Sequence, residues 1–403
     1  MHKNVTYPST LACTGCGACS AACGVGAITL SINNEGFYSA SVDHTKCVEC
    51  GACQRVCYKY ADLSTLLTLG DQACYATCSS NADTHATTTS GGFAYELSKW
   101  GIESGYAVMG VIYDYASDTA RTIIVDDIAG LEQLKGSKYI QSYTEEALHD
   151  FVERAMRNPS QRFICIGTPC QIFGLRSLVE AKHLKNEILY VDLFCHGVPS
   201  YLVWGPYVKQ QRERLGEIKS VNFRYKGNGW HQYSIRLVGE RSTYCNYAYN
   251  DPFYRYFFDN VALNTSCYTC KLRQRRAPSD IRIGDFLGRA YEDREDGISA
   301  AVAVTPNGKN VIAELANNQR INIVGEHTVE ECLKSQSTDD YNGIDLRNST
   351  IARLTDGDIE ATKRWYVKQF SLKHRIYLRL KSLTTLLPQR WIIALRRARR
   401  ATR

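Results

Sequence analysis

Two runs of four cysteines near the N-terminus constrain this chain more than any other feature. Both runs follow the spacing C-x2-C-x2-C-x3-C, and the second repeats the first 34 residues later. At this spacing the first three thiolates of a run bind one iron–sulfur cluster, and the fourth binds the other cluster. The sequence therefore predicts two 4Fe-4S clusters, one held by Cys13, Cys16, Cys19 and Cys57, the other by Cys47, Cys50, Cys53 and Cys23. A pair of zinc knuckles is the alternative use of these thiols.

The segment between the two runs is expected to form a β-hairpin. Alternating apolar residues over 28–32 lead into the turn sequence Asn-Asn-Glu-Gly at 33–36. Roughly residues 5 to 62 resemble a bacterial two-cluster ferredoxin domain. Such ferredoxins usually place proline after the fourth cysteine, whereas Gly24 and Tyr58 follow it here, and this departure bears on the surroundings and potential of each cluster.

A second group of cysteines is spread over the middle of the chain. The stretch RFICIGTPCQIFGLRSLVEAKHLKNEILYVDLFCHGVPS predicts a strand, a helix and a second parallel strand. Cys170 follows the first strand (162–167) and Cys195 ends the second (188–194), so both thiols are expected at the same rim of the sheet. With Cys267 and Cys270 they can close a third 4Fe-4S cluster, while a zinc site or ordinary buried cysteines are the alternatives. The remaining cysteines are taken as structural: Cys74, Cys78, Cys165, Cys245 and Cys332.

A candidate anion site precedes these strands. The small, polar loop 79–92 ends in Ser90-Gly91-Gly92 and runs into a predicted helix over 93–103. Free N–H groups at a helix N-terminus favour phosphate, although a simple helix cap is the alternative. Strands are expected at 107–113 and 121–125, followed by an amphipathic helix at 145–157.

Several ordered segments resemble the coenzyme F420 hydrogenase/dehydrogenase beta-subunit family, and the resemblance spans about residues 8 to 320. TTTSGGFAYELSKWGIESGYAVMGVIYD and GSKYIQS are similar to the N-terminal module of that family. GTPCQIFGLR, DLFCHGVPS, FRYKGNGWHQYSIRL and SCYTCKLRQRRAPSDIRIGDFLG are similar to its C-terminal module.

The resemblance implies FAD and a cluster close to it. It places eight residues in the flavin site: Ser90, Gly91, Gly92, Gly136, Ser137, Lys138, Gln141 and Ser142. It also implies that Cys170, Cys195, Cys267 and Cys270 are cluster ligands. Asp285 matches a family aspartate, whereas Leu287 stands where the family commonly has tryptophan. Four residues are expected to line the substrate side: Arg224, Lys226, Trp230 and His231. The alternative is that Arg224 and Lys226 are simply an exposed strand end.

These features predict an iron–sulfur flavoprotein oxidoreductase. Clusters move one electron at a time, and a flavin is the natural adaptor to two-electron chemistry. Electrons would pass through 4Fe-4S clusters to FAD and on to a two-electron acceptor, either coenzyme F420-like or another organic substrate, with a link to polysaccharide biosynthesis conceivable. A redox partner protein would donate or accept electrons. The alternatives are a non-catalytic electron-transfer subunit serving a separate enzyme and a redox-sensing regulator at a membrane.

The positive charge of the chain sits at its C-terminal end. The formal net charge is +7, yet residues 371–403 carry ten Lys/Arg and no Asp/Glu, so the rest of the chain is slightly acidic. Apolar residues recur at helical spacing in this segment: Ile376, Leu380 and Leu383, then Trp391, Ile392 and Leu395. Such a segment can lie on an anionic membrane surface, or dock as a terminal helix on its own domain. The body has no comparable basic stripe, so nucleic acid is not an expected partner.

Composition and pattern predict a multidomain α+β and α/β chain. Apolar residues make up 44% and charged residues 22%, which excludes wholesale disorder. No apolar run is long enough to span a membrane, and the N-terminus lacks the apolar core of a secretory signal, so we expect a cytoplasmic protein with, at most, peripheral contact at the inner membrane face. The expected parts are a two-cluster ferredoxin domain at 1–62, flavin-associated modules at 70–145 and 146–330, a connection at 331–370 and a basic tail at 371–403.

Overall fold

A nine-stranded mixed sheet forms the centre of the computed structural model, which describes residues 3–387 and Trp391. The strand order is β16-β4-β15-β14-β9-β8-β5-β6-β7, and the four central strands β14, β9, β8 and β5 are parallel. The strands are β4 (Ala73–Ser79), β5 (Tyr106–Asp114), β6 (Thr119–Val125), β7 (Ser142–Tyr143), β8 (Arg162–Gly167), β9 (Ile188–Leu193), β14 (Ile281–Asp285), β15 (Ser299–Ala303) and β16 (Ile321–Thr328). The sheet therefore draws strands from both 70–145 and 146–330.

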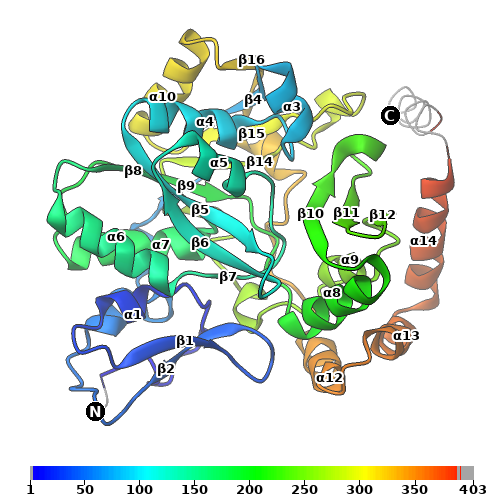
Figure 1. Ribbon diagram of the computed structural model, residues 1–403, viewed down its shortest axis with the longest axis horizontal. Coiled ribbons are helices and arrows are strands. Elements are labelled where there is room, and N and C mark those ends of the chain that lie inside the picture. The colour runs from blue at the N-terminus through cyan, green and yellow to red at the C-terminus, as the bar shows by residue number, and fades with distance from the viewer. Residues whose placement is uncertain (1–2, 388–390, 392–403) are drawn as a thin grey trace.

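Helices cover both faces of this sheet (Figure 1). Apolar residues of α4 (Phe93–Glu103) and α10 (Pro306–Asn317) pack on one face, beside α5 (Ile128–Leu134). On the other face, α6 (Glu145–Arg157) and α7 (Pro169–Ala181) share a core with α1 (Ala18–Ala22) of the cysteine-rich part. The N-terminal part is thus joined to the sheet through a common apolar core.

The cysteine-rich part consists of two short helices and a hairpin. These are α1, α2 (Ala52–Arg55), β1 (Ile28–Ile32) and β2 (Tyr38–Val42), and the hairpin is the one that the sequence predicts. Each helix follows a glycine with positive φ, Gly17 at 80° and Gly51 at 74°. Only glycine adopts this backbone easily, so the two halves of the cysteine repeat turn in the same way.

A second unit lies beside the sheet, at the right of Figure 1. It contains an antiparallel sheet of β10 (Ile218–Tyr225), β11 (Ser234–Gly239) and β12 (Thr243–Tyr247), with α8 (Tyr201–Leu215) and α9 (Pro252–Phe258). The chain then continues through α11 (Val329–Leu333), α12 (Ile344–Leu354), α13 (Ile359–Gln369) and α14 (Leu372–Leu383). Ile351, Leu354 and Tyr366 join the core of this unit, so the segment 331–370 is more than a connection.

Most of the expected elements are present. The predicted helices 93–103 and 145–157 match α4 and α6, and the predicted strand–helix–strand unit is β8-α7-β9. The expected loop 79–92 instead contains a short helix, α3 (Ala82–Thr87), because the Asn81 side chain accepts a hydrogen bond from Thr84 N and caps it. A two-residue ladder joins β3 (Leu67–Thr68) to β13 (Arg276–Ala277). Ile392 and Leu395 lie outside the described residues. Within the described part, every helix is too short or too polar to cross a bilayer.

Candidate functional site

The first predicted ligand set gathers in the N-terminal part. Burial, and then the neighbouring Cys16 and Cys13 thiols, raises the pKa of Cys19 well above its ordinary value. Burial and Cys16 raise the pKa of Cys57 to about 12. Thiols in such surroundings stay protonated unless a metal supplies positive charge, so the set of Cys13, Cys16, Cys19 and Cys57 is suited to an iron–sulfur cluster.

The second predicted set is more exposed. Cys53 is buried and its pKa is raised, chiefly by burial, with a further contribution from Cys23. Asn4 Nδ2 lies 3.7 Å from Cys47 Sγ, and Ala27 N donates to Cys23 Sγ at 3.3 Å. Cys50 is exposed. Amide donors to sulfur are a common means of tuning cluster potentials.

The four cysteines of the middle of the chain come together from three loops. Cys170 lies in the first turn of α7 and Cys195 follows β9, so the expected shared rim is confirmed. Burial and then Cys267 raise the pKa of Cys195 to about 12, and burial and then Cys270 raise that of Cys267 to about 11. Each of these four thiols is half-buried, whereas the second set includes the exposed Cys50. Among residues 3–387, no three His, Cys, Asp or Glu side chains lie close enough together to hold a single metal ion.

Contacts connect the first and third cysteine sets. A methyl group on Gly174 of α7 would stand 2.9 Å from Cys16 Sγ, so only glycine permits this approach. Tyr58 directly follows Cys57, packs edge-on against Phe173 with ring centroids 6.1 Å apart, and neighbours Cys270. Its hydroxyl accepts a hydrogen bond from Lys271 N at 3.2 Å. The buried ring of Tyr58 therefore lies next to residues of both sets.

A cavity of about 380 Å³ opens beside the third set. Its lining includes all four of these cysteines and seven of the eight residues assigned to the flavin site: Ser90, Gly92, Gly136, Ser137, Lys138, Gln141 and Ser142. Gly91 is the exception, because it packs against the backbone of Thr77 and Ser299. The cavity volume and mostly apolar lining suit an organic cofactor.

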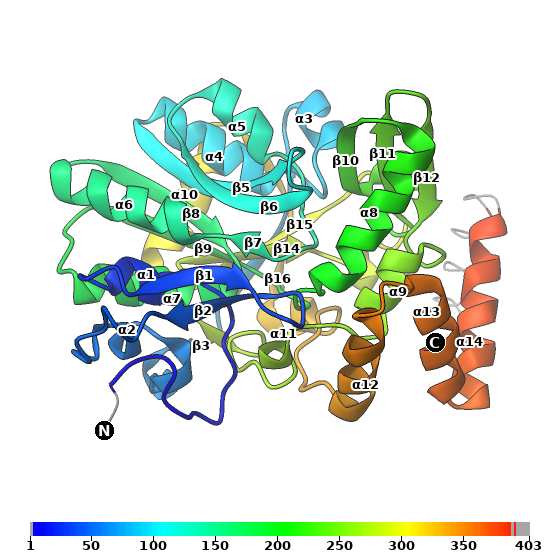
Figure 2. The same ribbon diagram turned by 60° about the horizontal axis from the view of Figure 1, so that its bottom comes forward.

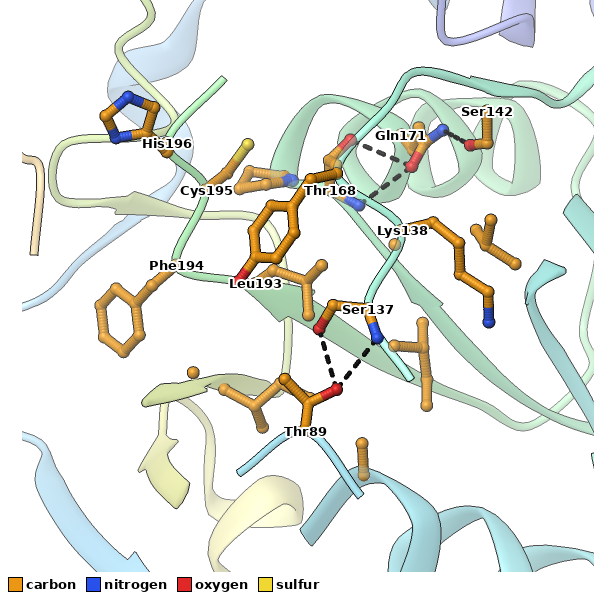
Figure 3. A pocket seen from close by; sticks show the side chains of 18 of the residues that line it. Thr89, Ser137, Lys138, Ser142, Thr168, Gln171, Leu193, Phe194, Cys195 and His196 are labelled. Carbon is orange, nitrogen blue, oxygen red and sulfur yellow. Dashed lines mark hydrogen bonds between the residues drawn. The ribbon is translucent and has the colours of Figure 1, made fainter. Parts of the chain in front are cut away.

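Polar groups on one wall are held in place by neighbours that the sequence analysis did not single out. Thr89 Oγ1 accepts hydrogen bonds from Ser137 N at 3.0 Å and Ser137 Oγ at 3.3 Å (Figure 3). Gln171 accepts from Thr168 N at 3.0 Å and donates to Ser142 Oγ at 2.8 Å. The pattern Thr168-x-x-Gln171 is a capping-box sequence, so this helix start was detectable from the sequence.

Two of the residues expected in the flavin site already form hydrogen bonds within the protein. Lys138 Nζ donates to the carbonyl oxygens of Leu134 at 2.9 Å and Lys135 at 3.0 Å, at the end of α5, and burial lowers its pKa to about 7. The Gln141 amide instead bonds the N-terminal part: it accepts from Tyr38 N at 2.7 Å and donates to the Thr14 carbonyl at 3.1 Å. Gln141 therefore fastens the cysteine-rich part to the cavity wall.

Two other lining residues of the cavity are charged. Asp285 lines the cavity and pairs with the buried Arg224 at 2.7 Å. Arg273 also lines it, and its buried Nε has no hydrogen-bond partner. An unpartnered guanidinium nitrogen at the cavity suits an anionic or carbonyl group of a ligand. Lys226, by contrast, donates to the carbonyls of His85, Ser90 and Asp296.

The four residues expected on the substrate side are not among the lining residues of this cavity: Arg224, Lys226, Trp230 and His231. Arg224 and Trp230 are buried, so this segment is not an exposed strand end either. Arg224 bears on the cavity through Asp285 and through Tyr139, a lining residue to whose hydroxyl Arg224 donates a hydrogen bond at 3.4 Å. His196, next to Cys195, is held by Asn260 Oδ1 at 2.7 Å, and burial lowers its pKa to about 4, which keeps the imidazole neutral.

Family models of known proteins match two parts of the chain. Residues 12–61 match the model of a 4Fe-4S dicluster domain, and residues 160–328 match that of the C-terminal part of the coenzyme F420 hydrogenase/dehydrogenase beta subunit. No curated protein matches the sequence. Among solved structures, the F420-reducing NiFe hydrogenase complex from Methanosarcina barkeri matches with 15% identity and a TM-score of 0.47, covering 75% of this chain and 93% of that one.

A dicluster domain joined to a mixed α/β module defines an iron–sulfur electron-transfer protein. Within that class, the chain is related to the coenzyme F420 hydrogenase/dehydrogenase beta subunits and has a 4Fe-4S domain at its N-terminus.

Proposed function

We propose that this chain is an iron–sulfur flavoprotein oxidoreductase that receives electrons from, or delivers them to, a partner protein. One observation carries the proposal: the third cysteine set and seven residues of the expected flavin site line the same cavity. A cluster and a flavin bound there would be neighbours. The chain would consist of a ferredoxin domain at 1–62 and flavin-associated modules at 70–145 and 146–330, and the two modules share the nine-stranded sheet.

We further propose three ligand sets for 4Fe-4S clusters. They are Cys13, Cys16, Cys19 and Cys57; Cys47, Cys50, Cys53 and Cys23; and Cys170, Cys195, Cys267 and Cys270. The contacts through Tyr58 and Gly174 support electron exchange between the first and third positions. Thr168 Oγ1, 3.3 Å from Cys170 Sγ, and the fixed neutral His196 hold the loops that bear these thiols.

FAD is the cofactor that we propose for the cavity, where it would exchange electrons singly or in pairs. Ser90, Gly92, Gly136, Ser137, Lys138 and Ser142 are the residues that would hold it, whereas the Gln141 amide is already bonded to Thr14 and Tyr38. Lys138 would place positive charge near anionic groups when protonated. The apolar lining would exclude water from the reacting part of the ligand.

The acceptor is proposed as a two-electron organic compound, either coenzyme F420-like or a sugar- or lipid-linked substrate of polysaccharide synthesis. The competing proposal is a non-catalytic subunit that passes electrons to a separate enzyme. The two differ in one respect: an enzyme lets a small molecule reoxidise its reduced flavin, and a mere electron-transfer subunit does not.

Anaerobic purification with iron, sulfide and flavin quantitation tests the proposal. We expect about twelve irons and about one FAD per chain. A content of about eight irons per chain would rule out the third cluster. A protein purified without flavin would rule out the proposed flavin-dependent enzyme. Reduction by a ferredoxin, followed by exposure to candidate acceptors, then separates the enzyme from the electron-transfer subunit by the recovery of flavin absorbance.

A further inference from the structure

The helix α14 is attached to the body by its polar side. Ser382 Oγ donates to Asn250 Oδ1 at 2.5 Å, and Asn250 Nδ2 donates to Thr385 Oγ1 at 2.7 Å just beyond the helix. Lys381 Nζ stands 3.8 Å from the ring centroid of Tyr249. Figure 2 shows the helix at the edge of the molecule, beside α13. The attachment of α14 therefore includes hydrogen bonds, one cation–π contact and the packing of His374 on Phe370, with ring centroids 4.8 Å apart.

Four apolar residues of α14 face outward, whereas Leu378 on the inner side is half-buried. Leu372, Ile376, Leu380 and Leu383 are 64%, 49%, 59% and 56% exposed. Their spacing of four, four and three residues places them on one side of the helix, opposite Lys381. A helix of a water-soluble domain normally turns such a row toward the core. Here the usual orientation is reversed, which leaves an apolar stripe without a partner within the described chain.

Positive charge borders this stripe. Lys373 and Arg379 lie on either side of the row by helical position, and both are exposed. Residues 371–403 hold ten Lys/Arg and no Asp/Glu. A second copy of this chain is a poor occupant, because pairing two such helices would bring like charges together. The stripe fits a surface that combines negative charge with an apolar interior.

We propose that α14 lies on an anionic lipid surface, with its apolar row in the acyl region and its lysines and arginines at the level of the phosphates. Long basic side chains reach headgroups while their methylenes remain in apolar surroundings. Both the apolar area and the charge contribute to such binding. This inference stands on the geometry of α14 and does not depend on the proposed redox chemistry.

Flotation of the full, anaerobically prepared chain with lipid vesicles tests it. We expect binding to vesicles of phosphatidylcholine with about a third phosphatidylglycerol, little binding to phosphatidylcholine alone, and at least tenfold weaker binding in high salt. The double variant Ile376→Asp/Leu380→Asp should lose at least tenfold in vesicle affinity. Because both side chains are exposed, its melting temperature and iron content should match those of the parent.

A matched control introduces the same charge change elsewhere. Met156 of α6 and Ile344 of α12 are also exposed, so Met156→Asp/Ile344→Asp should bind vesicles as the parent does. Equal binding by the Ile376→Asp/Leu380→Asp variant would overturn the proposal, as would equal binding to neutral and anionic vesicles. A dimer that the α14 variant abolishes, with no vesicle binding by the parent, would assign the stripe to a protein interface instead and would also overturn it.

Discussion

Gly174 and Cys16 belong to separate parts of the chain and meet in the fold, where a Cβ on Gly174 would stand 2.9 Å from Cys16 Sγ and 3.0 Å from Ala18 Cβ. Gly174→Ala should therefore force α7 and α1 apart. We expect a loss of about 1–3 kcal/mol in the free energy of unfolding, as for other overpacked sites, together with easier loss of iron. Thermal unfolding and iron release to a chelator measure both effects.

Gly205 of α8 is the matched control, since a Cβ there meets no atom within 4 Å. Gly205→Ala should raise stability by up to about 1 kcal/mol through the better helix propensity of alanine. Two Gly→Ala changes within helices are thus expected to have opposite signs. A stabilising effect of Gly174→Ala would contradict the close approach.

Cys267→Ser tests the third ligand set. We expect the variant to lose about four irons per chain, the content of one cluster, and to keep the N-terminal clusters. Cys245, which is exposed and lies on β12, provides the control: Cys245→Ser should keep the full iron content. Unchanged iron in the Cys267 variant would rule out this residue as a ligand.

The turn of the N-terminal hairpin is fastened to α12 by charge. Both oxygens of Glu35 accept from Arg347, at 2.8 and 2.7 Å, and Arg347 is fully buried. Glu35→Gln removes the carboxylate that neutralises this buried charge, while Arg347 keeps its hydrogen bonds to Leu263 O and Asn348 Oδ1. Because Glu35 itself is partly exposed, we expect a loss of about 1–2 kcal/mol in the free energy of unfolding, below the range for fully buried pairs.

Glu153→Gln is the comparison for this loss. Glu153 and Arg157 form an ion pair on α6 in which both side chains are exposed. Its removal should change the free energy of unfolding by less than about 0.5 kcal/mol. Equal effects of the two substitutions in chemical denaturation would show that Arg347 does not depend on Glu35.

Lys138 should make binding of an anionic ligand depend on pH. Burial lowers its pKa from 10.5 to about 7, so the side chain is an ammonium below pH 7 and an amine above it. Affinity for FAD or ADP is therefore expected to fall as pH rises through 7, by about tenfold between pH 6 and 9. Calorimetric titration of flavin-free protein measures it.

Lys138→Met should remove this dependence and leave weak, pH-independent affinity. Lys135 also lines the cavity but pairs with Glu132 at 3.4 Å, so Lys135→Met should retain the pH profile. If the affinity of the Lys138→Met variant still falls as pH rises through 7, another titrating group causes the pH dependence.

Local sequence patterns were sufficient to predict part of the fold and of the candidate site. The hairpin at β1 and β2, the helix α4 and the placement of Cys170 and Cys195 at one rim all follow from short-range rules: turn residues, helical spacing and the handedness of parallel units. These rules act within about 30 residues of sequence, where spacing determines which way a side chain points.

Only the tertiary structure decided which segments remote in sequence are in contact. Gln141 resembles a flavin residue in sequence but bonds Thr14 and Tyr38, and the unassigned segment 331–370 supplies Ile351 and Tyr366 to a core. The sequence by itself determined the cysteine repeats, the family resemblance and the basic end of the chain. The outward orientation of α14 and the contact of Gly174 with Cys16 required the fold, because packing between remote segments depends on the shape of both partners and leaves no periodic trace in either.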